Sequence, residues 1–188
     1  MPYAGDHFIS PGREHSRAIA TLRMLPRSTY DTYAVVELFH ARDSYSGLMT
    51  VRTAVAADAP RLAALSGVLG YPVAPEALAL RLERLLARSD HTVLVADRGG
   101  VVGWVHAAEQ ELLEYERRCE ILGLVVDAEV RGQGVGRRLV SAVERWAAAR
   151  GLSEVAVRSN VVRTESHPFY ERLGYSRVKT QHSYRKRL

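Results

Sequence analysis

The feature that most constrains this chain is a glycine-rich turn between an apolar segment and an amphipathic one. Residues 131–136 read RGQGVG; an apolar, strand-like run ends just before them, and a helix-like pattern follows as far as residue 150. Glycine reaches backbone conformations that other residues avoid, and it lets main-chain N–H groups come close to a ligand. A helix that begins at such a turn points its free N–H groups and its positive dipole end at the same spot. The turn is therefore predicted to bind an anion, with a tight turn that only packs helix on sheet as the alternative.

The surroundings of the turn favour a pyrophosphate and exclude two common phosphate motifs. Arg131, Arg137 and Arg138 add positive charge on both sides of the glycines. A P-loop needs G-x-x-x-x-G-K-[ST], and no Lys-Ser or Lys-Thr pair directly follows the glycines of this turn. A dinucleotide fingerprint needs G-x-G-x-x-G after the first strand of a βαβ unit, whereas this turn reads G-x-G-x-G and lies late in the chain.

Periodicity along the rest of the chain predicts an α/β domain with a mixed, mostly antiparallel central sheet flanked by helices. The expected order is β-α-α-β-β-β-α-β-α-β. Strands are expected at 49–55, 91–96, 101–107, 120–126, 155–157 and 177–184, and helices after Asp58, after Pro75, at 135–150 and at 165–173. Asp58 is expected to be the N-cap of its helix because a proline follows in the first turn. The segment between the third and fourth strands is expected to be an acidic loop.

Regular patterning begins near Met49, and residues 1–48 show no sustained periodicity. One interpretation is an ordered accessory arm. The other, which we favour, is that translation truly begins at Met49, so that residues 1–48 are a poorly ordered extension or a non-native start. We therefore expect the functional domain to be residues 49–188.

Composition limits the partners of this chain. The net charge is +5, but the basic residues are spread along the sequence and do not cluster on one expected helix or strand, so nucleic acid is not an expected partner. No apolar run approaches the ~20 residues that cross a bilayer, and the N-terminus lacks the pattern of a signal peptide, so we expect a cytoplasmic protein without a membrane partner. Cys119 is the single cysteine, which excludes an internal disulfide and a cysteine-built zinc site, and no metal is expected. The oligomeric state is left open, a homodimer included.

Two separated motifs resemble the GNAT superfamily of acetyl-CoA-dependent N-acetyltransferases. Residues 131–136 are similar to the family's Q/R-x-x-G-x-G/A signature. Asn160, Arg163 and then HPFYERLGY at 167–175 are similar to its N…R…H-x-F-Y-E-x-L-G-[FY] segment. The resemblance covers roughly residues 49–188, and the pattern around Trp104 and His106 looks most like the small-molecule branch.

The resemblance implies acetyl-CoA as the co-substrate and assigns its contacts. The strand before the turn offers main-chain groups to the pantetheine arm, the glycine turn holds the pyrophosphate, and an asparagine near the fifth strand contacts the cofactor. The cofactor-binding residues implied in this way are Leu124, Val125, Val126, Arg131, Gly132, Gln133, Gly134, Val135, Gly136, Arg137 and Asn160.

The resemblance also implies two catalytic residues. Tyr170 matches the tyrosine that gives a proton to the departing thiolate. Glu120 matches a glutamate that serves as base in the histone-acetylating branch, and strand alternation would place residues 120, 122, 124 and 126 on one face. A water relay in place of Glu120 is the alternative, and a main-chain N–H near Val126 would hold the oxyanion.

The acceptor is less constrained by the sequence. Glu109, Glu111, Glu114 and Glu116 crowd the connection before Glu120, and such an acidic lip would attract cationic amines unless these residues are simply solvated. The expected function is transfer of acetyl to a primary amine of a small cationic or amino-bearing molecule. A protein N-terminal or lysine N-acetyltransferase is one alternative, and a non-catalytic acyl-CoA-binding module is another.

Overall fold

A computed structural model describes residues 48–188 of this chain, so the prediction for residues 1–48 lies, apart from Leu48, outside the described residues. Five strands form one sheet in the order β1-β2-β3-β4-β5: β1 (Thr50–Thr53), β2 (His91–Asp97), β3 (Val101–Leu112), β4 (Tyr115–Val126) and β5 (Val155–Val157). The helices are α1 (Ala59–Val68), α2 (Pro75–Leu86), α3 (Val135–Ala149) and α4 (Ser166–Arg172), with short 3₁₀ helices η1 (Ala56–Asp58) and η2 (Ala128–Val130). Strands β1 to β4 pair antiparallel and β5 joins β4 in parallel, which confirms the predicted mixed, mostly antiparallel sheet.

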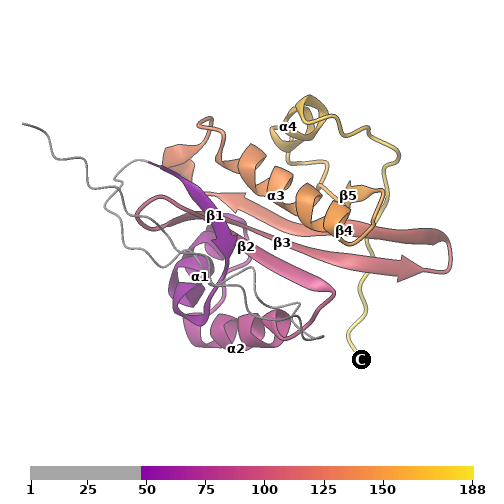
Figure 1. The fold of residues 1–188 in the computed structure, drawn as a ribbon. Coiled ribbons are helices and arrows are strands. Elements are labelled where there is room, and N and C mark those ends of the chain that lie inside the picture. The colour runs from indigo at the N-terminus through magenta and orange to yellow at the C-terminus, as the bar shows by residue number, and fades with distance from the viewer. Residues whose placement is uncertain (1–47) are drawn as a thin grey trace, which may run out of the picture. The chain divides into compact units, whose positions relative to one another are not determined.

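Helices cover both faces of the sheet (Figure 1). Alternation along the strands sends Val105 of β3 toward α3, where it packs with Leu139 and Val143. On the opposite face, Leu62 of α1 and Leu82 of α2 pack against the sheet in a second cluster. The α4 helix lies on the α3 side. The sheet is therefore a buried layer whose two faces belong to different helices.

The strand expected at 177–184 is wrong. Residues 173–188 form neither helix nor strand, and Val178 and Tyr184 are almost fully exposed. The neighbouring β5 is only three residues long. A short edge offers few main-chain partners, so the alternating pattern of this segment has little to pair with.

The acidic loop expected between the third and fourth strands is also wrong, because β3 and β4 continue into a long hairpin that turns between Leu112 and Tyr115. Opposite charges across the strands support the extension. Glu109 accepts hydrogen bonds from Arg117 Nε at 2.6 Å and from Arg150 Nε at 3.2 Å. The carboxylate is thus neutralised within the domain, and it lines neither of the two cavities described below.

A β-bulge in β4 changes which of its residues share a face. His106 lies opposite Gly123 and Ala107 opposite Ile121, so Leu122 is an extra residue without a partner. The prediction that residues 120, 122, 124 and 126 share a face is therefore wrong.

The burial pattern follows this shifted register. Leu124 and Val126 pack on the α3 side, whereas Val125 packs on the side of α1 and α2. Beyond the bulge, Ile121 returns to the α3 side, and its neighbour Glu120 therefore faces the side of α1 and α2.

An arginine fork ties β1 to the start of α1. Arg52 donates to both carboxylate oxygens of Asp58, at 2.7 and 2.9 Å, and to Asp97 at 2.8 Å. Asp58 is the residue directly before α1, in the predicted N-cap position, but its side chain makes no capping hydrogen bond to that helix. It accepts instead from the main-chain N–H of Val55 at 2.8 Å and so closes the η1 turn. Burial raises the pKa of Asp58, but the hydrogen bonds from Arg52 and Val55 outweigh burial and lower it.

Candidate active site

The glycine turn precedes α3 and has the conformation that only glycine adopts readily. Gly132 has φ +76° and Gly134 has φ +81°, and Gly134 is the N-cap residue directly before α3. Gly136 is needed for a different reason, because a Cβ there would lie 3.1 Å from Cζ of Phe169. Two of the three glycines therefore shape the turn, and the third lets α4 pack on α3.

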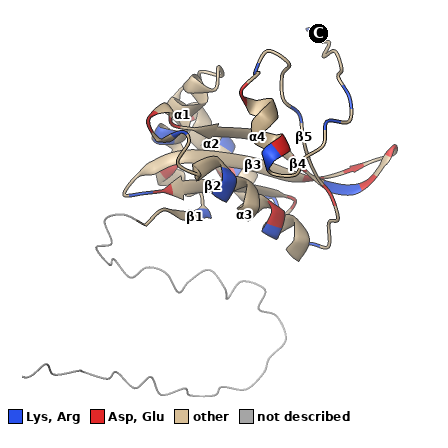
Figure 2. Cartoon of the chain, turned by 90° about the horizontal axis from the view of Figure 1, so that it is seen from above, with Lys and Arg blue, Asp and Glu red and all other residues tan. Residues whose placement is uncertain are grey.

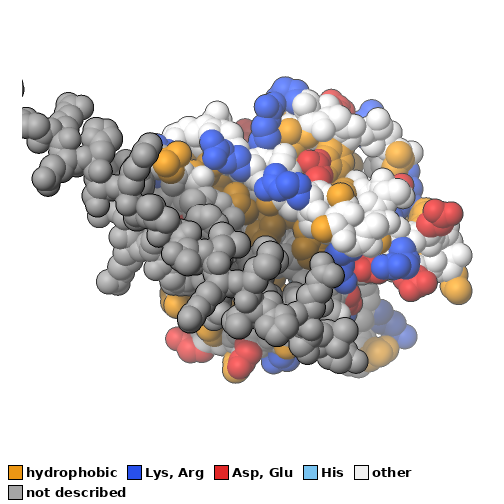
Figure 3. Space-filling model, in the orientation of Figure 1, with side chains coloured by type: hydrophobic (Ala, Val, Ile, Leu, Met, Phe, Trp, Pro, Cys, Tyr) orange, Lys and Arg blue, Asp and Glu red, His pale blue; other side chains and the backbone are white. Residues whose placement is uncertain are grey.

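Side chains around the turn supply positive charge and hold its position. Arg131 and Arg137 are exposed beside the glycines, and Lys and Arg side chains gather over the α3 side of the face in Figure 3. Gln133 Oε1 accepts a hydrogen bond from Arg98 Nη1 at 2.8 Å, which links the turn to the β2–β3 connection. The structure thus brings the predicted residues 131–137 together at the positive end of α3.

The two parallel strands separate directly beside this turn. β4 and β5 pair only from Cys119 to Ile121 with Val155 to Val157. From Leu122 to Val126, the β5-facing edge of β4 has no strand against it among residues 48–188. Main-chain groups on this edge are available to an extended ligand, as in addition of a strand. The predicted residues Leu124, Val125 and Val126 lie on this edge, and the geometry fits a pantetheine arm.

A cavity of about 170 Å³ occupies the gap between the separated strands and α4. Its wall includes Leu122, Gly123, Leu124, Asn160, Arg163 and Tyr170. Asn160 stands where the chain leaves β5; its side chain accepts a hydrogen bond from Val162 N at 3.1 Å. Arg163 Nη2 donates to the main-chain oxygen of Leu69 at 2.7 Å, which fixes this loop to the end of α1.

Tyr170 reaches the same cavity from α4. Its ring packs edge to face with Phe169 and Tyr175, at centroid distances of 5.0 and 5.6 Å. Burial raises its pKa to about 12, although the charge of Arg163 acts in the opposite direction. The hydroxyl therefore stays protonated at neutral pH and can donate a proton.

Glu120 is buried, with 2% of its surface exposed, and it lines neither cavity. Its Oε1 accepts a hydrogen bond from Arg158 Nε at 2.5 Å, and Arg158 does line the 170 Å³ cavity. Its Oε2 lies 3.8 Å from Arg118 Nη2 and has no hydrogen-bond partner in the described part of the chain. Glu120, the predicted base, therefore does not line the cavity but is hydrogen-bonded to a residue that does. That residue, Arg158, is part of the site and was not predicted from the sequence.

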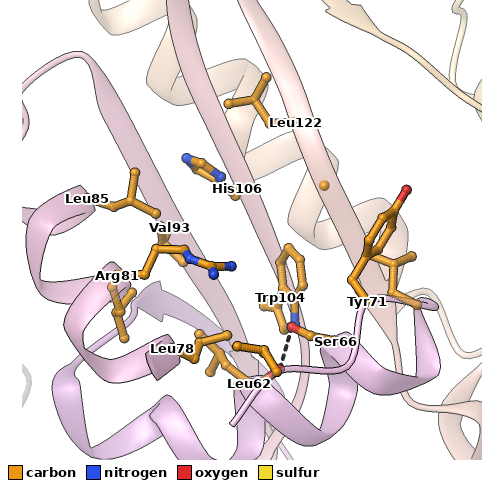
Figure 4. A pocket seen from close by; sticks show the side chains of 14 residues that line it. Leu62, Ser66, Tyr71, Leu78, Arg81, Leu85, Val93, Trp104, His106 and Leu122 are labelled. Atoms are coloured by element: carbon orange, nitrogen blue, oxygen red, sulfur yellow. Dashed lines mark hydrogen bonds between the residues drawn. The ribbon is translucent and has the colours of Figure 1, made fainter. Parts of the chain in front are cut away.

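A second, larger cavity of about 320 Å³ lies between α1, α2 and the sheet (Figure 4). It shares Leu69, Tyr71, Leu122 and Gly123 with the first cavity, so the two meet at the bulge of β4. A Cβ at Gly123 would lie 3.0 Å from the indole of Trp104, so any larger residue would displace that ring. The bulge and this glycine together create the passage between the cavities.

His106 lines the larger cavity and is paired with His91. His106 Nε2 lies 2.8 Å from His91 Nδ1, and the rings stack with centroids 5.1 Å apart. Burial, followed by the charges of His91 and Arg88, lowers the pKa of His106 to about 4, so its ring is neutral at pH 7. The sequence contained a signal for this pair, because the β2–β3 hairpin places alternate residues of both strands on one face.

Arg81 of α2 also lines the larger cavity and was missed. The signal was its position three residues after Leu78 and four before Leu85, which puts a charged residue on the apolar side of α2. Its side chain is exposed, so Arg81 stands at the open side of this cavity, where it can contact a ligand.

Charged side chains of both signs are spread over the domain (Figure 2). Within residues 48–188, no group of three or more His, Cys, Asp or Glu side chains is placed to bind a metal ion. In the same range, no helix has the length and apolar character needed to cross a membrane.

The domain thus combines a glycine turn flanked by arginines, an open strand edge and two cavities that meet at the bulge of β4. The chain belongs to the acetyltransferase (GNAT) family, whose model matches residues 60–175. The predicted superfamily, and with it acetyl-CoA as the family's co-substrate, is thereby confirmed.

Two relatives are named for the small molecules that they acetylate. Glucosamine 6-phosphate N-acetyltransferase 1 of Oryza sativa subsp. japonica is 36% identical over 111 residues, which cover 55% of this chain and 65% of that protein. Aminoglycoside N(6')-acetyltransferase type 1 of Serratia marcescens is 30% identical over 121 residues, which cover 61% of this chain and 82% of that protein. The match thus spans just under two thirds of the length of the Oryza protein.

The fold also resembles that of solved acetyltransferases. AAC(6')-Iy, in complex with the bisubstrate analog CoA-S-monomethyl-acetylneamine, has a TM-score of 0.67 to this chain at 23% identity. The similarity covers 75% of this chain and 99% of that one. The predicted fold class is therefore confirmed.

Proposed function

We propose that this chain is an acetyl-CoA-dependent N-acetyltransferase whose acceptor is a primary amine of a small molecule. The observation that carries the proposal is the junction of the two cavities at Leu122 and Gly123. One cavity lies along residues 121–124 of β4, and the other is bounded by α1 and α2. A thioester in the first and an amine in the second would meet at this junction.

The cofactor side uses residues 131–137 for the diphosphate, the main chain of residues 124–126 for the pantetheine arm, and Asn160 near the end of β5. Acetyl-CoA supplies the acetyl group as a thioester. The protein's part is to hold that group at the bulge of β4, where a free main-chain N–H can face the carbonyl oxygen on which negative charge develops. Nothing in this arrangement needs a side-chain nucleophile.

Tyr170 is the proton donor in this proposal. Its hydroxyl reaches the cavity and stays protonated because burial raises its pKa to about 12. A donor of this kind protonates the thiolate as it departs. For Glu120, the base role stays a prediction. Because Glu120 is bound to Arg158 and does not line the cavity, it could act as a base only through a water molecule. The alternative is that Glu120 only holds Arg158 in place.

The domain boundary at Met49, the cytoplasmic location, the lack of nucleic-acid and membrane partners and a homodimer stay predictions from the sequence. We propose that residues 49–188 suffice for cofactor binding, because the turn, the open strand edge and both cavities are built from residues in that range.

The proposal is tested by acetyl-CoA turnover, followed as release of free thiol, over amines, amino sugars, aminoglycosides and short peptides. Turnover with small amines is the expected result. Turnover confined to peptides would favour the protein-acetylating alternative. Binding of acetyl-CoA without turnover of any amine would favour a non-catalytic acyl-CoA-binding module.

A further inference from the structure

The chemistry of the larger cavity defines the kind of amine that it can accept, an inference that rests on the proposed function. The larger cavity meets the smaller one, which we assign to the cofactor, at Gly123. Arg81 lines the larger cavity only. Figure 4 shows the guanidinium of Arg81 extending from α2 toward Trp104. An amine that reacts at the Gly123 end would therefore place the rest of its molecule toward Arg81.

The charge of this wall is positive. Arg81 is its one permanently charged side chain, and no Asp or Glu of the described part of the chain lines it. His106 is neutral at pH 7 because its pKa is lowered to about 4 by burial and neighbouring positive charge. The acidic lip expected from the sequence is not at this cavity, and Glu109 is bound by Arg117 and Arg150. A polycationic acceptor would leave its remaining ammonium groups without a carboxylate partner, which is costly in a partly buried site.

Most of the wall is aliphatic or aromatic, with leucines from α1, α2 and β4 around the ring of Trp104. Two of the polar groups in it are already hydrogen-bonded. Ser66 Oγ donates to the main-chain oxygen of Leu62 at 2.8 Å, and His106 Nε2 is bonded to His91. A sugar with many hydroxyls would find few hydrogen-bond partners here, whereas an apolar ligand would pack well against this wall.

Among the donors of the wall, those of Arg81 and Trp104 have no acceptor within residues 48–188. Arg81 makes no ion pair or hydrogen bond there, and the buried Nε1 of Trp104 has no partner. An exposed arginine at the open side of an apolar cavity can pair with the carboxylate or phosphate of a ligand whose apolar part occupies the cavity.

We propose that the acceptor is a small primary amine with an apolar body and one anionic group at the end opposite the amine, and that Arg81 binds that anionic group. This differs from the molecules in the names of the relatives, a sugar phosphate and aminoglycosides. The difference arises from the apolar wall and from the absence of carboxylates along its described part.

The test compares matched amines with and without the anionic group. 4-(Aminomethyl)benzoate and 4-methylbenzylamine share a ring and an amine, and 6-aminohexanoate and hexylamine share a chain. Glucosamine 6-phosphate and tobramycin test the polar and polycationic alternatives. We expect kcat/KM for each carboxylate to exceed that of its neutral partner by at least about tenfold, the usual effect of a charge-assisted hydrogen bond.

Arg81→Met keeps the apolar stem and removes the charge. It should lower kcat/KM for the carboxylates at least about tenfold, mainly through KM, and change the neutral amines less than about twofold. Arg84→Met is the matched control, because Arg84 is exposed on the same helix and lines neither cavity. An unchanged carboxylate preference in Arg81→Met, or better turnover of tobramycin or glucosamine 6-phosphate, would overturn the inference.

A binding readout separates this inference from the proposed function. With CoA bound, 4-(aminomethyl)benzoate should raise the melting temperature more in the wild type than in Arg81→Met. If that difference appears without turnover of any amine, the proposed function fails and the anion site stands. If amines are acetylated but the difference is absent and the preference unchanged, the anion site fails and the proposed function stands.

Discussion

Replacing Gly134 by aspartate should weaken the binding of acetyl-CoA far more than it destabilises the fold. Gly134 has φ +81° and open space around its missing Cβ, so Gly134→Ala and Gly134→Asp meet no clash. Each should nevertheless lose about 1–2 kcal/mol of unfolding free energy, the cost of a left-handed conformation for a residue with a Cβ. The Asp variant also puts a negative charge beside the bound diphosphate. At about 5 Å and an effective dielectric of about 20, two unit charges repel by about 3 kcal/mol, or roughly two orders of magnitude in Kd.

Gly151→Asp is the matched control for that change. Gly151 has φ +73°, is equally open, and follows the other end of α3. A helix of 15 residues separates the two glycines by about 20 Å. Gly151→Asp should therefore lose a similar free energy of unfolding and keep its affinity for acetyl-CoA. Calorimetric titration of folded protein measures both Kd values, and wild-type affinity in a folded Gly134→Asp variant would falsify the assignment of the diphosphate site.

Three further predictions concern the base, the domain boundary and the Arg52 fork. Glu120→Gln removes the charge that pairs with Arg158, and if Glu120 is the base it should erase or shift the acidic limb of the kcat/KM pH profile; an unchanged profile would assign the base role to a water relay. A chain that starts at Met49 should fold, bind acetyl-CoA and melt within a few degrees of the full chain, whereas loss of binding would place residues before Met49 in the functional unit. Asp58→Asn should lower the free energy of unfolding by about 1–3 kcal/mol at pH 7, because it weakens the buried charge-assisted bonds to Arg52. Since folding lowers the pKa of Asp58 from 3.8, its contribution is complete above about pH 4 and is lost as the pH falls through the folded pKa. Denaturation at several pH values should show wild type and variant converging below pH 4, and a constant difference would contradict this assignment.

The parts of the fold that the sequence predicted are those specified by local patterns. The turn at 131–136 needs glycine at two positions for backbone reasons, and its helix follows at once in the chain. The hairpin of β2 and β3 is likewise encoded by a short turn between alternating segments. Each of these features depends on residues that are neighbours in sequence.

The parts that could not be predicted depend on contacts between distant segments. The bulge at Leu122 depends on the pairing of β4 with β3; the one local hint is Gly123, because an isolated glycine within a strand can mark a bulge. That single extra residue moves Glu120 to the opposite face from Leu124. The larger cavity unites α1, α2 and three strands, so the place of Arg81 beside Trp104 emerges only from packing.

Tyr170→Phe gives the most direct test of the central claim that the junction beside Tyr170 moves an acetyl group from acetyl-CoA to an amine. Free thiol and N-acetylated amine would be quantified in the same reaction, the second by mass spectrometry, for wild type and variant. The wild type should form one N-acetyl product per thiol released. The variant, which keeps the ring packed between Phe169 and Tyr175, should lose at least about tenfold in turnover while its affinity for acetyl-CoA stays the same. Thiol release without an N-acetyl product, or full turnover by Tyr170→Phe, would contradict the account.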